Sequence, residues 1–223
     1  MPSNLRRVFS SSVGTKLLIG LTGLALFVYL ITHLAGNAII FFGQDAFNEY
    51  AHTLISNPLI VVVEIGLLLV FLLHIYKSIT MWLANEAARP ARYAQMNRAG
   101  HTSRKSFASS TMIVSWLLTL LFVVVHVKQF KYGSFYLIEG RDAVRDLYRT
   151  EIEVFTQPIW VAFYVICTLV VGLHLRHGIA SGFQSLGVDH PRYTKRLKLW
   201  GIVGAVIIAG GLAAIPVWVF LTK

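Results

Sequence analysis

Four histidines lie inside strongly apolar stretches of this sequence, one in each of four separate stretches: His33, His74, His126 and His174. An imidazole in hydrocarbon is costly unless it has a partner, and an ionisable residue in such a setting indicates a functional site. Neutral imidazole is a good ligand for iron. Four such residues on four helices therefore predict two haems, each held between two histidines.

The composition is that of a helical membrane domain. The 223 residues are 56% hydrophobic and 13% charged, and the mean hydropathy of +0.64 is too high for an ordinary soluble domain. A single cysteine, Cys167, cannot supply a disulfide framework, a CxxCH haem attachment or a thiolate cluster for iron–sulfur or zinc. Any haem is therefore expected to be non-covalent.

Apolar stretches long enough to cross a membrane as helices recur five times. Their expected bounds are about 16–42, 58–84, 108–127, 158–182 and 199–221. Between the third and the fourth, apolar residues at helical spacing predict a short amphipathic helix on the outer surface, over about 141–154. The sequence thus predicts one all-α domain, residues 1–223, an integral membrane bundle of five transmembrane helices with a four-helix haem-binding core.

The distribution of charge predicts the orientation. The formal net charge is +10, and the excess of Lys and Arg lies in the N-terminal segment and in the connections after the second and fourth spans. Cytoplasmic connections of membrane proteins carry such an excess, so we expect the N-terminus in the cytoplasm and the C-terminus outside. Because these charges flank membrane spans, we expect no nucleic acid as partner. Besides setting the orientation, the basic residues could dock acidic cytoplasmic proteins.

Depth along the helices sorts the histidines into two pairs. At 1.5 Å per residue, His33 and His126 lie roughly 25 to 27 Å from the cytoplasmic ends of their spans, and His74 and His174 roughly 12 to 15 Å. One haem is therefore expected between His33 and His126, toward the outside. The second is expected between His74 and His174, nearer the cytoplasm.

Other side chains near the histidines could serve the same haems. Lys77 and His177 lie one turn nearer the cytoplasm than His74 and His174, where they could reach haem propionates or simply extend to the interface. Small residues near the ligands would let a flat macrocycle approach the backbone, although such residues also serve helix packing. They are Gly36, Ser78, Gly172 and Gly178.

Two places in the sequence could serve a quinone. Glu64 is the only carboxylate inside an apolar span and lies near the depth of the outer haem. It could exchange protons with a bound quinone, or it could be protonated and hydrogen-bonded to a neighbouring helix. A quinone site on the cytoplasmic side, near Ser12, Lys16 and the inner haem, is also open.

Three motifs follow one another along the chain. They are Ser11-Ser-Val-Gly-Thr-Lys-Leu-Leu-Ile-Gly-Leu-Thr-Gly23 with His33-Leu-Ala-Gly-Asn37, then Ala46-Phe-Asn48 with His52, then His174-Leu-Arg-His-Gly-Ile-Ala-Ser-Gly-Phe-Gln-Ser-Leu-Gly187. In this order they resemble the five-helix dihaem cytochrome b subunit of succinate dehydrogenases and fumarate reductases. The resemblance covers nearly the whole chain, including helix number and histidine placement.

The resemblance implies a membrane anchor for two cytoplasmic subunits, a flavoprotein with FAD and an iron–sulfur protein. Electrons would pass between succinate or fumarate and a membrane quinone through two haems b, with His33, His74, His126 and His174 as axial ligands. It implies the bacterial inner membrane as location, with contact to lipid and quinone, and a higher oligomer of the complex is open. Since the chain has no dicarboxylate site and no GxGxxG flavin motif, it is expected to be the electron-transfer, quinone-reactive subunit of the enzyme.

Two other functions remain open on the sequence. Dihaem cytochromes b that serve a hydrogenase or a formate dehydrogenase also use bis-histidine haems, but with other helix counts and histidine positions. A proton-coupled transporter could use intramembrane histidines as a relay. Transporters often contain internal inverted repeats, and none is visible here.

Overall fold

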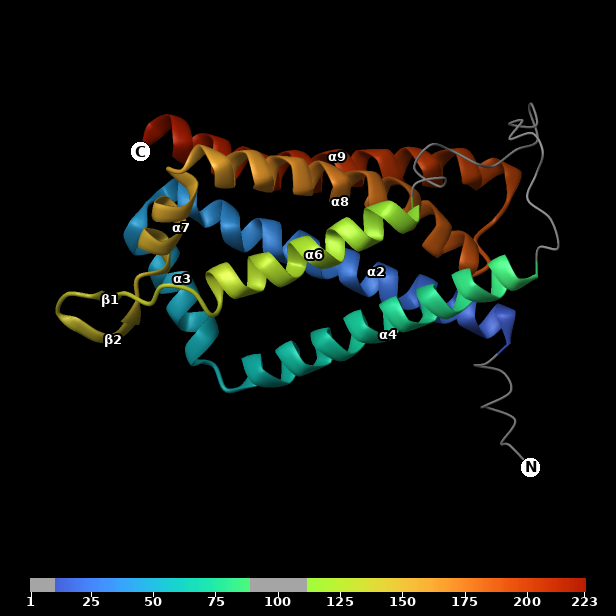
Figure 1. The fold of residues 1–223 in the computed structure, drawn as a ribbon, viewed down its shortest axis with the longest axis horizontal. Coiled ribbons are helices and arrows are strands. Elements are labelled where there is room, and N and C mark those ends of the chain that lie inside the picture. The colour runs from blue at the N-terminus through green and yellow to red at the C-terminus, as the bar shows by residue number, and fades with distance from the viewer. Residues whose placement is uncertain (1–10, 89–111) are drawn as a thin grey trace.

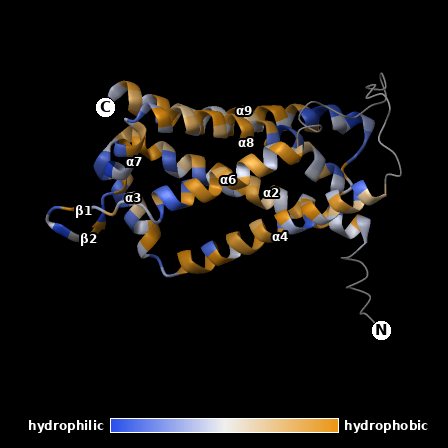
Figure 2. Ribbon diagram, viewed as in Figure 1, coloured by the Kyte–Doolittle hydropathy of each residue, from blue (hydrophilic) through white to orange (hydrophobic). Residues whose placement is uncertain are grey.

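Five long helices lie side by side in the computed structural model, which describes residues 11–88 and 112–223 (Figure 1). They are α2 (Ser12–Asn37), α4 (Leu59–Ala87), α6 (Met112–Phe130), α8 (Pro158–Ser185) and α9 (Pro191–Thr222). Each is long and apolar enough to cross a membrane, and their middles are largely hydrophobic (Figure 2). The predicted all-α bundle of a multi-pass membrane protein is confirmed. The start of the third span at 108 and most of the basic connection before it lie outside the described residues.

The helix starts follow local chemistry. The Ser11 side chain accepts a hydrogen bond from the backbone N–H of Gly14 at 3.0 Å, and Pro158 opens α8 as expected. Helix α9 begins at Pro191, not at 199, so the basic segment 191–198 is helical too. The predicted span, 199–221, lies within this longer helix, because hydropathy marks where a helix enters hydrocarbon, whereas Lys and Arg are good helix formers outside it.

One end of the bundle carries three short helices and a pair of strands among the described residues, and we call it the cap end. These are η1 (Ala38–Phe42), α3 (Gln44–Ser56), β1 (Leu137–Ile138), β2 (Arg141–Arg145) and α7 (Leu147–Phe155). The opposite end, with the α8–α9 connection (186–190) and the start of α2, is the turn end (Figure 1).

The surface helix predicted over 141–154 is wrong in its first part. Residues Arg141–Arg145 form strand β2, which pairs antiparallel with β1. Gly140 adopts φ +77° in the turn between the strands, a conformation that glycine adopts without strain. Helix α7 starts only after Asp146, whose carboxylate accepts from the backbone N–H of Arg149 at 3.0 Å. A turn and a helix cap thus override the helical spacing of the apolar residues.

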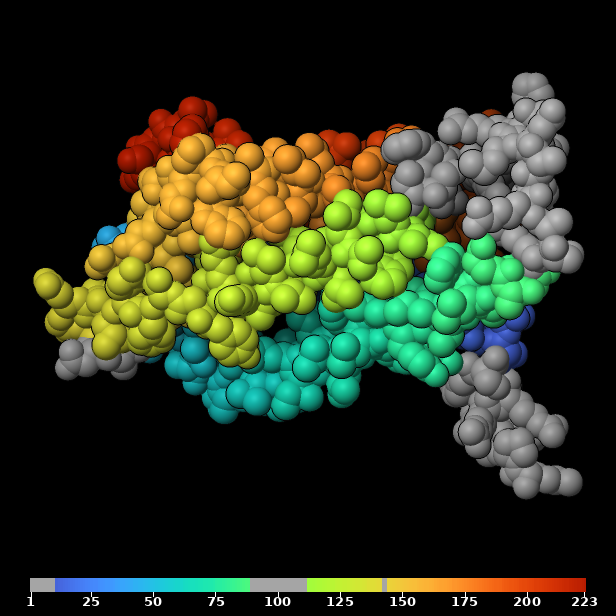
Figure 3. All heavy atoms as spheres, viewed as in Figure 1, coloured from blue at the N-terminus to red at the C-terminus, as the bar shows by residue number. Residues whose placement is uncertain are grey.

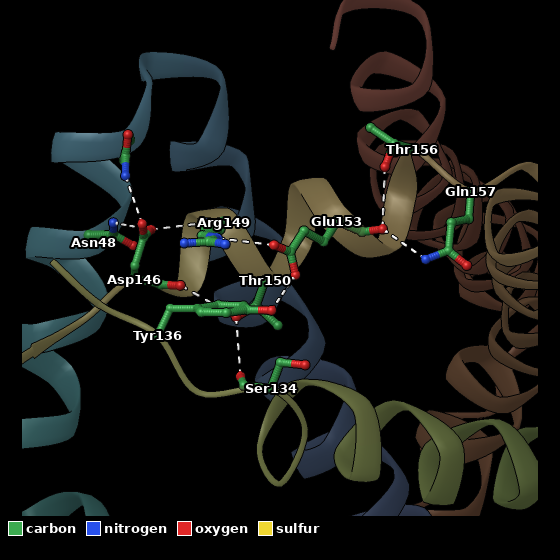
Figure 4. A network of polar contacts seen from close by, with 10 residues as sticks. Asn48, Ser134, Tyr136, Asp146, Arg149, Thr150, Glu153, Thr156 and Gln157 are labelled. Carbon is green, nitrogen blue, oxygen red and sulfur yellow. Dashed lines mark hydrogen bonds and ion pairs between the residues drawn. The ribbon is translucent and has the colours of Figure 1, made fainter.

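Asp146 also ties α7 to α3. Its carboxylate accepts hydrogen bonds from the side-chain amides of Gln44 and Asn48, both at 2.8 Å (Figure 4). The side-chain carbonyl of Asn48 in turn accepts from the backbone N–H of Tyr148 at 2.9 Å. Asp146 is 7% exposed, so these bonds satisfy a buried charge. The cap end is therefore a fixed structure at the end of the spans.

Helix packing inside the bundle is uneven. Helices α8 and α9 pack closely, because Gly172 faces the side chain of Ala209 and Gly201 faces the backbone carbonyl of Arg176. Helix α4 has no buried residue; it packs against α2 and, near its start, α3. Figure 3 shows the surface hollowed between α6 and α4. The inward face of α4 is therefore the least covered part of the bundle.

Candidate functional site

His33 of α2 and His126 of α6 lie next to each other near the cap ends of their helices. Their ring centroids are 5.6 Å apart and the ring planes meet at 80°. Imidazole nitrogens bind metal at about 2 Å, so two rings on opposite sides of one metal have centroids about 6 Å apart. The structure thus brings together the two histidines that the depth calculation pairs, at a spacing suited to a shared metal.

An aromatic shell surrounds His126. The rings of Phe122, Phe130 and Tyr164 lie 5.7, 5.3 and 6.0 Å from its ring, centroid to centroid. Its Nδ1 is buried and has no hydrogen-bond partner among the described residues. A buried polar atom without a hydrogen-bond partner destabilises a fold, so this nitrogen calls for an explanation, and a group bound beside the ring could provide one.

His33 has a polar neighbour on its own helix. The hydroxyl of Tyr29, one turn earlier, lies 3.3 Å from Nδ1 of His33, and the two rings stack with centroids 5.4 Å apart. Glu64 and Tyr50 lie close enough to Tyr29 to act on its hydroxyl electrostatically. Glu64 therefore lies within electrostatic range of the tyrosine that contacts His33.

Thr22 of α2 holds the ring of His74 of α4. The Thr22 hydroxyl lies 3.0 Å from Nδ1 of His74 and also donates to the backbone carbonyl of Leu18 at 2.6 Å. Since its one proton goes to that carbonyl, the hydroxyl accepts from Nδ1–H of His74. The proton on Nδ1 leaves Nε2 with a free lone pair, the form in which histidine binds a metal.

The ring of His74 also lies against the backbone of α2. A Cβ atom on Gly23 would be 3.0 Å from Cε1 of His74, which is closer than such atoms normally approach. Any side chain at position 23 would press on the ring. The absence of a side chain at Gly23 therefore leaves room for the His74 ring between α2 and α4.

His174 of α8 completes the second pair. It lies close enough to His74 and to His177 for their charges to affect it. Its Nδ1, like that of His126, is buried without a partner among the described residues. The structure thus also brings the second predicted pair into mutual range.

Along α2, the two pairs stand one above the other. Thr22, which contacts His74, is about three turns before His33, roughly 16 Å along the helix. His74 comes from α4, which buries none of its residues, and the other three imidazoles come from α2, α6 and α8. Two unpartnered buried nitrogens, a glycine cradle and an open interior fit two flat groups bound between imidazoles.

Four residues predicted to lie near the histidines, Lys77, His177, Gly172 and Gly178, differ from one another in what they contact. Lys77 is half-buried, with Nζ 5.8 Å from the centroid of the Tyr76 ring, and His177 lies near His174. Gly172 packs against α9 and so serves helix packing, whereas a Cβ on Gly178 would meet no atom within 4 Å.

Glu64 is not an isolated carboxylate in hydrocarbon. It lies in the second turn of α4 and forms an ion pair with Lys131, directly after α6. The Glu64 side chain is 47% exposed and that of Lys131 44%. The expectation of a protonated Glu64 bonded to a neighbouring helix is therefore corrected to a half-exposed ion pair at the cap end.

Ser12 and Lys16 lie at the other end of the bundle. Both are exposed in the first turns of α2. Glu64 lies at the cap end, so these residues and Glu64 belong to two separate places, and only one of the two can be close to the His33–His126 pair.

Six contact residues of the histidines were not predicted: Thr22, Gly23, Tyr29, Phe122, Phe130 and Tyr164. Tyr29, Phe122 and Phe130 each stand one helical turn from a histidine of their own helix, a spacing that could have identified them. The other three contact histidines of different helices, and no spacing within one helix reveals them. Searches of family models, curated proteins and solved structures find no match to this chain.

Proposed function

We propose that this chain is the membrane-anchor cytochrome b subunit of a succinate:quinone oxidoreductase, binding two haems b and passing electrons between an iron–sulfur subunit and a membrane quinone. One observation carries the proposal: His33 lies beside His126 with ring centroids 5.6 Å apart, and about three helical turns away His174 lies within electrostatic range of His74, inside an apolar bundle. A relay of histidines, as in a transporter, would not need two such pairs.

The chain's own residues hold and orient the ligand nitrogens. Haem iron held between two imidazoles exchanges single electrons. Thr22 fixes the ring of His74 with its Nδ1 proton toward α2, and Tyr29 lies beside Nδ1 of His33. Partners of this kind set ring orientation and ligand basicity. The aromatic shell around His126 excludes water and keeps the local dielectric low.

The cap end is the proposed place of the quinone. The carboxylate of Glu64 is half-exposed, paired with Lys131 and close to Tyr29, whose hydroxyl reaches His33. Oxidation of a hydroquinone releases two electrons and two protons, so an acceptor for each must lie nearby. The imidazole pair marks the electron path and Glu64 supplies a proton acceptor.

The proposed orientation puts the turn end in the cytoplasm of a bacterial cell. Exposed basic residues gather there at the start of α9, and the rule of cytoplasmic positive charge supports this assignment. The flavoprotein and the iron–sulfur subunit then dock at the turn end, and electrons enter at the His74–His174 pair.

The test is a reduced-minus-oxidised absorption spectrum of the purified protein together with its haem content. Sharp b-type bands and two haems per chain are expected. Addition of succinate to the co-purified complex should reduce the haems. A protein without haem would contradict the whole proposal, and reduction by formate or hydrogen in place of succinate would assign the cytochrome to another dehydrogenase.

A further inference from the structure

An apolar cavity opens on the membrane face of the bundle near the turn end, away from the histidines. Its volume is about 310 Å³, and α2, α8 and α9 form its walls. The walls include Phe27, Ile179, Phe183, Trp200, Val203 and Ile207. A hollow with such walls in a membrane span accepts hydrocarbon and excludes water.

Two arginines stand on the same face of α9, directly before the cavity. Arg192 and Arg196 precede Trp200 by two turns and one turn, and residues four apart lie above one another on a helix. Along α9 the residues change from hydrophilic to hydrophobic at this point (Figure 2). The cavity therefore continues into a cationic rim at the level where lipid headgroups lie.

Both arginine side chains are exposed at the surface. Within the described residues, no hydrogen bond or ion pair engages the side chain of Arg192 or Arg196. Each can form paired hydrogen bonds to a phosphate.

The length of this surface matches one leaflet. Arg196 and Ile207 are about 16 Å apart along α9, and half of a hydrocarbon core about 30 Å thick is about 15 Å. Trp200, 65% exposed, lies between the basic and apolar parts, as interfacial aromatic residues do. A charged head and one chain of a single lipid fit this span.

We propose that the groove between α2, α8 and α9 is a binding site for an anionic phospholipid, with its phosphate on Arg192 and Arg196 and an acyl chain in the cavity. The cationic rim favours an anionic lipid over a zwitterionic one. The site is independent of the haem assignment, because neither the rim nor the cavity includes a histidine.

The test is a lipid titration of the delipidated full chain, followed by native mass spectrometry, with phosphatidylglycerol and phosphatidylcholine as probes. Phosphatidylglycerol should bind more tightly. The double variant Arg192→Gln/Arg196→Gln should weaken its binding about 30-fold, since each basic side chain near an anionic headgroup contributes about 1 kcal/mol and 1.4 kcal/mol is a factor of ten.

A matched control removes the same charge from another face of the same helix. Lys195→Gln/Lys198→Gln should retain most of the binding, and Val203→Phe should lose it by filling the cavity with both arginines intact. If both charge variants lost phosphatidylglycerol binding equally, the lipid would be held only by the general positive charge of the surface, and the proposed site would be wrong. Unchanged binding by Val203→Phe, or a purified chain that carries an isoprenoid quinone in this groove, would overturn the acyl-chain assignment.

Discussion

The Thr22 hydroxyl of α2 lies 3.0 Å from Nδ1 of His74 of α4, while its own proton goes to the carbonyl of Leu18 at 2.6 Å. With the proton of His74 on Nδ1, Nε2 is the nitrogen that remains for iron in the proposed haem site. The contact between Thr22 and His74 also links the position of α4 to that of α2, since it joins the two helices directly.

Replacement of Thr22 by valine tests this relationship. Thr22→Val keeps the shape and removes the hydroxyl, so His74 loses its orienting partner, and we expect haem affinity at the His74–His174 pair to fall by about 10-fold to 100-fold. Haem titration of the apoprotein measures the change. Thr168→Val is the matched control, because Thr168 is also buried and also donates to a carbonyl one turn earlier, at 2.9 Å. Equal losses in both variants would mean that the hydroxyl acts only on helix packing.

Loss of a histidine should remove one haem and spare the other. His33→Ala and His126→Ala should abolish the same haem signal, because their rings lie 5.6 Å apart, and His74→Ala and His174→Ala the other, because these two lie within electrostatic range of each other. Redox titration followed by optical spectroscopy separates the two signals. His52→Ala, on α3, serves as control and should retain both. If His33→Ala and His74→Ala removed the same haem, the pairing would be wrong.

Added bulk at Gly23 should displace the His74 ring. In Gly23→Ala the new Cβ would lie 3.0 Å from Cε1 of His74, so the ring must shift, and we expect a changed spectrum and lower occupancy of that haem. Gly66→Ala adds the same atom in α4 where no atom lies within 4 Å. It should leave the spectrum unchanged and stabilise the helix by about 0.5 to 1 kcal/mol. An unchanged haem spectrum in Gly23→Ala would refute the close contact.

Removal of the Glu64 carboxylate tests the proposed quinone site. Glu64→Gln keeps the size and removes the proton acceptor, so quinone-linked turnover should fall about tenfold or more while both haem spectra stay intact. Glu49→Gln is the control, since Glu49 is an exposed glutamate at the same end, 3.6 Å from Arg141. If Glu64→Gln kept full turnover and intact haems, Glu64 would have no role in proton transfer and would serve only in the ion pair with Lys131.

Glu151 of α7 should make stability depend on pH. Burial raises the pKa of this carboxyl to about 8 from its ordinary value near 4.5, and its Oε2 has no hydrogen-bond partner among the described residues. The folded protein therefore holds a proton that the unfolded chain releases. The free energy of unfolding should decrease as pH rises from about 4.5 to 8, by up to about 1.4 kcal/mol per pH unit.

The check is the thermal unfolding of Glu151→Gln in detergent at about pH 5, 6.5 and 8. The variant cannot ionise, so its stability should decline less over this range and exceed that of the unchanged protein at the highest pH. Glu139→Gln, an exposed carboxyl beside the β1–β2 turn, should keep the original slope. The same slope in Glu151→Gln would show that the proton is held elsewhere.

Helical rise is fixed by backbone geometry, and for this reason the sequence could predict the five spans and the facing of His33 with His126. The rotation of one helix against another is decided by tertiary packing, so the contacts of Thr22 and Gly23 with His74 could not be predicted. The ion pair of Glu64 was missed because Lys131 lies beyond the apolar stretch that marked the third span.

The cap end shows a second limit of sequence patterns. Helix α3 has three buried residues, Phe47, Asn48 and Ala51, on one face, yet the search for apolar spans does not predict it, because it is too short and too polar to cross a membrane. Asn48 binds Asp146, about a hundred residues later in the chain, and so distant a partner is invisible to local periodicity.

Helix α4, which buries none of its residues, has a consequence for assembly. Because α4 packs mainly on α2, few protein contacts oppose its separation from α6 and α8. Ligation of His74 and His174 by one haem would bridge α4 to α8, so the free energy of haem binding would also be the free energy that closes the bundle. All five helices would then insert into the membrane first, and haem binding would fix α4 against α8 as the last step of assembly. The supply of haem would thus control how long the chain persists in the membrane.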